Sequence, residues 1–136
     1  MKVVNIKEIE KKTLPELHGE TALYQNVIEG DFPKPDLEGM RMWIITLKPG
    51  ADNTYHVHER GDQFYFVLKG RPTVEVGDER REAKPWDFFY LPSRLPHRVS
   101  NDTKETCIVQ GLGTSPRYLL LKYRNMAKRM LRKISG

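Results

Sequence analysis

Short apolar runs separated by turn residues fill most of the chain. The runs are rich in β-branched and aromatic residues, and glycine, proline or aspartate follows them about every eight to twelve positions. The pattern predicts strands at 21–28, 41–47, 63–68, 73–76, 80–83, 86–91, 97–100, 106–112 and 118–122, and a short extended segment at 54–58. Many short strands of this kind indicate an all-β sandwich or barrel.

The end of the chain follows a helical period instead. Tyr123, Met126, Met130 and Ile134 recur at spacings of three and four, and basic residues occupy another face. This pattern predicts a basic amphipathic helix over 123–136. Its apolar side would pack on the protein's own barrel or on a sister subunit, or else bind a membrane surface or a nucleic acid.

The N-terminal residues show no sustained period. We expect a short lead-in strand or helix, a turn near Pro15, and a loop at 29–40, which holds two prolines and two glycines. The chain therefore divides into a lead-in at 1–40 that packs on the barrel, a barrel at 41–122 and the helix at 123–136.

The net charge of +5 is unevenly distributed along the 136 residues. From Arg117 onward there are seven lysines and arginines and no acidic residue, so the rest of the chain has a net charge of −2. The strands show no interleaving of basic and aromatic residues, and we expect no nucleic-acid partner. No apolar run reaches about 18 residues, and no secretory signal is recognisable, so we expect no membrane span and a cytoplasmic location. Cys107 lies in an apolar run and is expected to be a buried core thiol.

The candidate chemistry lies in the stretch 50–70. His56 and His58 are two positions apart in extended structure, so their imidazoles project from one face, where they can share a divalent transition metal. His97 lies in a later segment that could meet this pair. The fourth histidine, His18, stands beside a glycine and close to two acids, and we expect it on the surface rather than at a metal.

Two segments of the chain resemble the two sequence motifs of the cupin superfamily. The first segment has the family spacing throughout, with Gly50, His56, His58, Gln63 and Gly70 at the motif positions. The second segment keeps the proline, histidine and asparagine of the second motif at Pro92, His97 and Asn101. The two motifs together cover about residues 50–101, and the flanking predicted strands fit the same fold.

The resemblance implies an antiparallel jelly-roll β-barrel with metal ligands that point into its lumen. By the resemblance, His56, His58 and His97 would bind a divalent transition metal. Gln63 would supply the fourth ligand, and Asn101 would hold a turn. The ligand set is compatible with Fe, Zn, Mn, Ni or Cu, and the sequence does not choose among them.

Three positions depart from the family pattern. Gln63 stands where the family has glutamate, so it would bind a metal more weakly and without charge. Trp86 and Arg94 replace two glycines, and we expect the second turn to differ locally. Glu59 and Asp62 are nearby acids that could substitute for the missing carboxylate, but Asp62 is out of register by one and would face the other way on a strand.

A neutral fourth ligand leaves the charge of a divalent ion uncompensated in a low-dielectric interior. We therefore expect a small substrate that binds through negatively charged oxygen or by chelation. The leading hypothesis is a metal-dependent enzyme of the dioxygenase type, an oxidoreductase. The alternatives are a non-catalytic module that binds or senses a small molecule, an isomerase or decarboxylase, and a structural protein with a vestigial site. The motif holds no second carboxylate for acid–base work, which weakens the isomerase hypothesis.

Alternation along the strand at 63–68 turns Gln63, Tyr65 and Val67 inward. Tyr65 is the candidate catalytic residue, because its hydroxyl could donate to a substrate oxygen, although an inward tyrosine also serves packing. The outward residues of this strand are large and apolar: Phe64, Phe66 and Leu68. They predict cover by the N-terminal segment or by a second subunit, and because related small cupins are often dimers we expect a homodimer.

Three arginines flank the segments that carry the candidate ligands. They are Arg60, Arg94 and Arg98. They could attract an anionic substrate, or they could simply be solvated surface residues.

Overall fold

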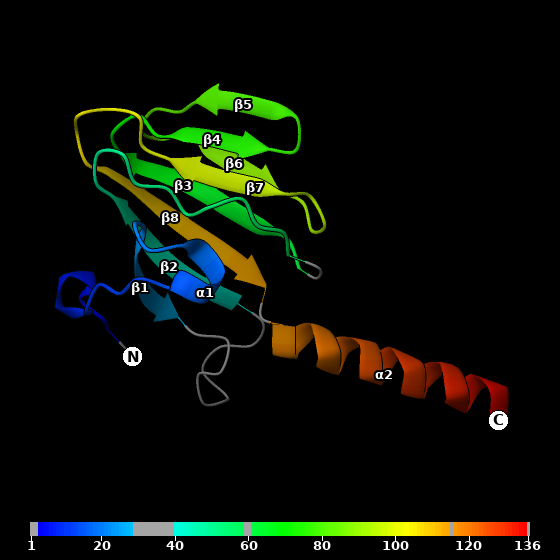
Figure 1. Ribbon diagram of the computed structural model, residues 1–136. Coiled ribbons are helices and arrows are strands. Elements are labelled where there is room, and N and C mark those ends of the chain that lie inside the picture. The colour runs from blue at the N-terminus through cyan, green and yellow to red at the C-terminus, as the bar shows by residue number, and fades with distance from the viewer. Residues whose placement is uncertain (1–2, 29–39, 59–60, 115, 136) are drawn as a thin grey trace.

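The computed structural model describes residues 3–28, 40–58, 61–114 and 116–135. Its strands form two sheets in which every pair is antiparallel (Figure 1). The larger sheet has the order β1-β2-β8-β3-β6, and the smaller sheet has the order β5-β4-β7. The strands are β1 (Leu23–Ile28), β2 (Met40–Leu47), β3 (Gln63–Lys69), β4 (Thr73–Val76), β5 (Glu79–Glu82), β6 (Phe88–Leu91), β7 (His97–Ser100) and β8 (Cys107–Thr114).

The two sheets enclose the hydrophobic core. Alternate residues of each strand face inward, as the period of two requires. The inward residues of β2 are Trp43, Ile45 and Leu47, and they meet Val67, Val74, Val99 and Val109 from other strands. Cys107 is buried in the same core and is a free thiol, as predicted. The architecture is the predicted all-β, antiparallel jelly-roll barrel.

The predicted strands agree with the observed ones to within two residues, with one exception. The strand expected at 118–122 is wrong, because those residues belong to helix α2 (Pro116–Ser135), which also begins earlier than the helix expected at 123–136. The apolar run at 118–121 fits both a buried strand and part of a helix, so periodicity does not separate them. Pro116 stands at the first helical position, where its fixed φ favours a helix start.

The segment before β1 contacts the segment that follows β2. The 3-10 helix η1 (Ile6–Glu8) and the short helix α1 (Pro15–His18) precede β1. The Thr21 hydroxyl accepts from the Asp52 backbone N–H and donates to the Asp52 carbonyl, each at 3.0 Å. Most of the loop expected at 29–40 lies outside the described residues. No described helix is both long and apolar enough to cross a membrane.

Candidate metal centre

Three histidines, two from the first motif and one from the second, meet inside the barrel. His97 begins β7, and His56 pairs with it through an isolated antiparallel bridge, with two N–H···O bonds of 3.1 and 2.9 Å. The ring centroid of His58 lies 5.0 Å from that of His56 and 5.1 Å from that of His97. One potential ligand nitrogen from each ring lies within 4.8 Å of the others. The convergence of the three rings that the sequence predicted is therefore present.

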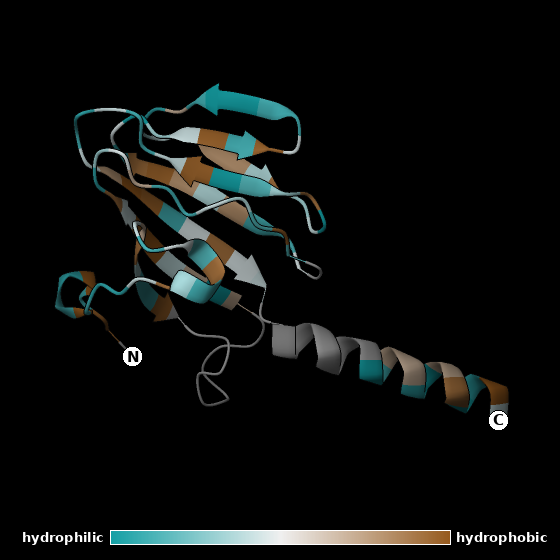
Figure 2. Cartoon of the chain, in the orientation of Figure 1, coloured by the Kyte–Doolittle hydropathy of each residue, from teal (hydrophilic) through white to brown (hydrophobic). Residues whose placement is uncertain are grey.

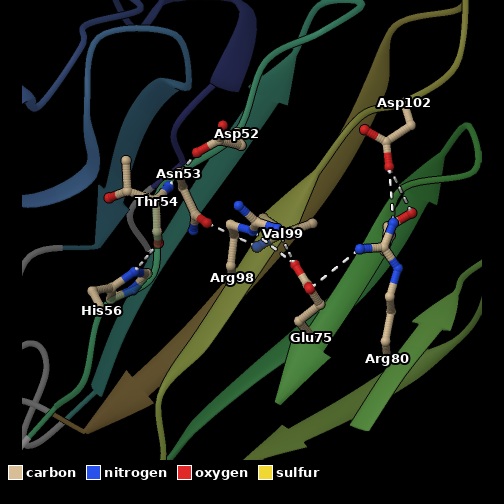
Figure 3. Close-up of polar contacts among 10 residues, drawn as sticks. Asp52, Asn53, Thr54, His56, Glu75, Arg80, Arg98, Val99 and Asp102 are labelled. Carbon is tan, nitrogen blue, oxygen red and sulfur yellow. Dashed lines mark hydrogen bonds and ion pairs between the residues drawn. The ribbon is translucent and has the colours of Figure 1, made fainter. Parts of the chain in front are cut away.

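The hydrogen bonds of these rings leave their inner nitrogens free. His56 Nδ1 lies 2.8 Å from the Thr54 carbonyl oxygen (Figure 3), and His97 Nδ1 lies 3.3 Å from the Leu95 carbonyl oxygen. A carbonyl can only accept, so each Nδ1 carries the proton and each Nε2 keeps a lone pair. The Nε2 atoms of His58 and His97 are buried, and no described residue bonds to them. Buried lone pairs that converge without partners suit a transition metal, and backbone carbonyls commonly orient such ligands.

Burial keeps the histidines neutral. It lowers the pKa of His58 to about 4 and, together with the neighbouring His56, lowers the pKa of His97 to about 4 as well. Burial also lowers the pKa of His56. A neutral imidazole is the form that binds a metal ion, so the cluster is ready to accept a cation at neutral pH without losing protons.

Gln63 lines the same cavity as His56 and His58, a space of about 30 Å³. Gln63 is only 7% exposed, so the inward orientation predicted for its side chain is confirmed. Asp62 faces elsewhere and accepts a hydrogen bond from the Ser93 N–H at 3.1 Å, as its register predicted. Glu59 lies outside the described residues. Whether Gln63 contacts the metal stays a prediction.

Tyr65 is fully buried and also lines this cavity. Its hydroxyl oxygen accepts a hydrogen bond from Asn53 Nδ2 at 3.0 Å, and Asn53 Oδ1 in turn accepts from the Val99 N–H at 2.8 Å (Figure 3). Burial raises the pKa of Tyr65 well above its ordinary value, so the phenol keeps its proton. The hydroxyl is thus held in place from one side and retains a proton to donate.

His18 also belongs to this cavity, and the surface position expected for it is wrong. Helix α1 brings its ring against His56, at a centroid distance of 4.4 Å, and stacks it on Tyr24 at 4.8 Å. Its Nδ1 is buried without a hydrogen-bond partner among the described residues, and burial lowers its pKa to about 3. No periodic pattern in the sequence marks His18, because it lies on a four-residue helix outside the motifs.

Arg41 is the cavity's cationic residue, and the sequence analysis did not single it out. It lies two positions before Trp43 on β2, so both face inward, and its guanidinium carbon stands 5.2 Å from the centre of the Trp43 ring. The arginines that the sequence suggested lie elsewhere. Arg94 is exposed, and Arg60 is outside the described residues.

Arg98, the third suggested arginine, points to the outer face of the smaller sheet. There it forms a 2.7 Å ion pair with Glu75, which Arg80 joins at 3.3 Å (Figure 3). On its own, burial would raise the pKa of Glu75, but hydrogen bonds from Arg98 and Tyr55 and the two arginine charges hold it below its ordinary value. This network stabilises the outer side of β4 and β7 and does not face the cavity.

A family model described as a cupin domain matches residues 43–112, about half of the chain. The chain belongs to the cupin family. The matched region runs from β2 to β8 and contains all three clustered histidines.

One relative of this cupin matches part of the chain. "Uncharacterized protein MJ1618" of Methanocaldococcus jannaschii is 31% identical over 52 residues, which are 38% of this chain and 42% of that protein. The match therefore spans less than half of that relative's length.

Two solved structures share the fold at low identity. A predicted oxalate decarboxylase from Thermotoga maritima superposes with a TM-score of 0.73 at 16% identity, over 84% of this chain and 99% of that one. The polyketide cyclase RemF from Streptomyces resistomycificus has a TM-score of 0.72 at 17% identity, over 84% and 79%. These likenesses establish the cupin fold.

The cupin turns that lack their glycines keep a glycine-like backbone. Trp86 has φ of 79° and Arg94 has φ of 68°, in the left-handed region that non-glycine residues seldom occupy. The Arg94 N–H donates to the His58 carbonyl at 2.7 Å, and the Trp86 N–H donates to the Val67 carbonyl at 2.9 Å. These backbone bonds hold the two residues in the conformation that glycine favours, against its strain. Whether the second turn differs locally from that of other cupins stays a prediction.

Asn101 holds a turn, as the resemblance implied. Its side-chain amide donates to the carbonyl oxygens of Leu47 and Glu105, at 2.9 and 2.7 Å. Its Oδ1 accepts from the Thr103 N–H at 2.9 Å. The side chain is fully buried and joins the end of β2 to the turn before β8.

Proposed function

We propose that this cupin is a metal-dependent enzyme that acts on a small anionic or chelating molecule, with dioxygenase-type chemistry. The observation that carries the proposal is the convergence of three neutral imidazoles, two of which line a cavity together with an arginine. The imidazoles suit the cation, and the arginine suits an anionic group on the substrate. A space of about 30 Å³ holds roughly two water molecules, so a substrate has to displace part of the cavity lining to reach the imidazoles.

His56, His58 and His97 would hold a divalent transition metal, and Gln63 would be a neutral fourth ligand. Such a metal supplies Lewis acidity, and in the case of iron it also supplies redox chemistry with dioxygen. Four neutral ligands leave the positive charge of the centre for the substrate to balance. An enolate or carboxylate oxygen is the group that does so best.

The protein's own residues orient the substrate. Arg41 presents a fork of N–H donors to a carboxylate, and the Trp43 ring beneath it limits where that carboxylate can lie. Tyr65 donates its remaining proton to a substrate oxygen, because Asn53 already fixes its oxygen from the other side. The N-terminal segment that carries His18 covers the cavity and reduces the access of water.

Dioxygenation is favoured among the enzymatic alternatives. Both atoms of O2 enter the substrate, so the reaction needs neither a second cofactor nor an external reductant. An isomerase would need a positioned acid and base, and no aspartate or glutamate among the described residues lines the cavity. A decarboxylase remains an alternative, in line with the description of the Thermotoga maritima structure. A non-catalytic module that binds or senses a small anion is the other alternative.

Metal analysis and oxygen uptake test the proposal. Protein purified without an affinity tag should contain about one divalent metal per chain, and the iron-loaded protein should consume O2 with at least one member of a panel of diketones, thiol carboxylates and enol acids. Retained metal without turnover would favour the binding module, and CO2 release without O2 uptake would favour the decarboxylase. Metal-free protein whose melting does not change on adding metals would refute all three. His58→Ala should lose the metal, whereas Lys104→Ala, at an exposed turn, should keep it.

We also propose that a second copy of the chain covers the outer face of β3 and β6. Phe64 and Phe66 face Tyr90 and Phe88 across these strands, and Trp86 stacks edge-on against Phe66. Trp86, Phe88 and Tyr90 are 82%, 57% and 51% exposed, which is unusual for so many adjacent aromatic rings. Light scattering should give the mass of a dimer, and Phe88→Asp should give that of a monomer. A monomeric wild-type protein would overturn this part of the proposal.

A further inference from the structure

Helix α2 is the one described element that extends away from the barrel (Figure 1). It is 20 residues long, about 30 Å at 1.5 Å per residue. Side chains are described from residue 124 to residue 135, and all of them are exposed. Nothing in the described part of the chain covers this half of the helix.

The exposed half carries a continuous apolar arc. Met126, Met130, Leu131 and Ile134 are 47%, 63%, 64% and 81% exposed. At about 100° per residue they fall within roughly 140° of the helix circumference. Figure 2 shows hydrophobic and hydrophilic residues on different sides of this half. Large apolar side chains in solvent on one arc indicate a partner.

The borders of the arc are basic, and its back is basic and polar without any acid. Arg124 and Lys133 border the arc on its two sides, and the rest of the surface carries three further cations, Lys128, Arg129 and Arg132, together with Asn125 and Ser135. No acidic residue occurs from Arg117 to the end of the chain. The partner must therefore offer an apolar surface and negative charge together.

We propose that α2 docks on an anionic lipid membrane surface. The apolar arc enters the boundary between headgroups and acyl chains, and the bordering arginine and lysine extend their charged ends to the anionic headgroups. Pairing with α2 of a second copy would place the bordering cations, Arg124 and Lys133, against the bordering cations of the other helix, with no acid to offset them. A nucleic acid would satisfy the cations but would leave Met130 and Ile134 in water.

Vesicle sedimentation with the full chain tests this inference. The protein should sediment with phosphatidylcholine vesicles that contain about 30% phosphatidylglycerol, at least tenfold more than with pure phosphatidylcholine, and 0.5 M salt should release it. Met130→Ser with Ile134→Ser, and separately Arg124→Gln with Lys133→Gln, should each lower the partition coefficient by about tenfold or more. Asn125→Ser, on the polar side of the same helix, is the matched control and should change little.

Three results would count against membrane docking. Failure of the wild-type chain to bind anionic vesicles would overturn the inference. Binding that needs the cations but not the apolar arc, and that duplex RNA abolishes, would also overturn it. Such a result would indicate a nucleic-acid surface. Loss of dimeric mass in the Met130→Ser, Ile134→Ser variant would assign the arc to a second copy. The melting temperature should be equal in all variants, because these side chains do not touch the barrel.

Discussion

Gly111 on β8 leaves its side-chain space to the indole of Trp43 on β2. The two residues are direct cross-strand partners, and a Cβ at position 111 would overlap with the Trp43 ring atoms Cε2, Nε1 and Cζ2. The glycine thereby lets the indole lie flat along the inner wall of the cavity, next to Arg41. The shape of the site depends on the absence of a side chain one strand away.

Gly111→Ala should therefore destabilise the protein. The indole has to move, and overpacking of this kind costs about 1–3 kcal/mol. Thermal unfolding should show a clear loss, and the quenching of tryptophan fluorescence should change because the ring has shifted. Gly113→Ala is the matched control, since a Cβ there would be 3.2 Å from Trp43 and needs only a small adjustment. Equal melting temperatures for the two variants would refute the packing argument.

His18→Ala should weaken metal binding without abolishing it. The ring lies edge-on against His56 and helps to fix its orientation, and residues that orient a ligand typically contribute a factor of about 10–100 in metal affinity. Titration with Co²⁺ would measure the dissociation constant. His58→Ala should abolish binding, and Leu17→Ala, on the exposed side of the same helix, should leave it unchanged. Complete loss of binding in His18→Ala would instead make His18 a ligand.

The outcome for the four histidines shows where sequence reasoning works in this chain. His56, His58 and His97 stand at motif spacings, so their meeting could be predicted, and strand alternation placed Gln63 and Tyr65 inward. His18 could not be found, because its position depends on how a short helix packs across the barrel mouth.

Arg41 and the start of helix α2 were likewise missed from the sequence. Arg41 follows the alternation of β2, but its place in the site depends on this strand beginning beside the cavity, which the sequence does not show. The segment 118–122, apolar as far as Leu121, satisfied both the strand and the helix pattern, and the proline before it was the overlooked signal.

The metal-free protein should lose stability as the pH falls from about 7 to 5. Burial lowers the pKa of His58 and of His97 from 6.5 to about 4, so below pH 6.5 the unfolded chain binds protons that the folded chain refuses. Each pKa unit corresponds to about 1.4 kcal/mol per group when the difference is fully developed. The two histidines change the free energy of unfolding by nothing above the pKa of the unfolded chain. Below it, the loss of stability grows until the pH reaches the pKa of the folded protein.

Urea unfolding in the presence of a chelator, at pH 7, 6 and 5, would measure this slope. His58→Gln should flatten the pH dependence, because it removes one titrating group. Lys104→Gln, at an exposed turn, should leave the slope as in the wild type. A wild-type stability that does not change between pH 7 and pH 5 would contradict the neutral buried state of these rings.

Arg94→Gly should stabilise the protein. The residue has φ of 68° and is exposed, so glycine removes backbone strain and loses little packing. The gain should be roughly 1 kcal/mol, although the larger freedom of the unfolded glycine chain offsets part of it. The N–H bond to His58 survives, so metal affinity should be unchanged. Arg81→Gly, on strand β5 with no positive φ, should destabilise instead, and a loss of stability in both variants would show that the turn is unstrained.

Arg41→Gln should lower the affinity of the metal-loaded protein for small carboxylates such as oxalate. A charge-assisted hydrogen bond contributes about 1.5–3 kcal/mol, so the dissociation constant should rise by roughly 10–100-fold while the metal content stays constant. Arg41→Lys should recover only part of the affinity, because lysine keeps the charge but not the planar fork. Arg81→Gln, which removes the same charge from an exposed edge strand, should change the affinity little. Equal losses in Arg41→Gln and Arg81→Gln would mean that only the overall charge of the protein attracts the anion, and that Arg41 does not contact it.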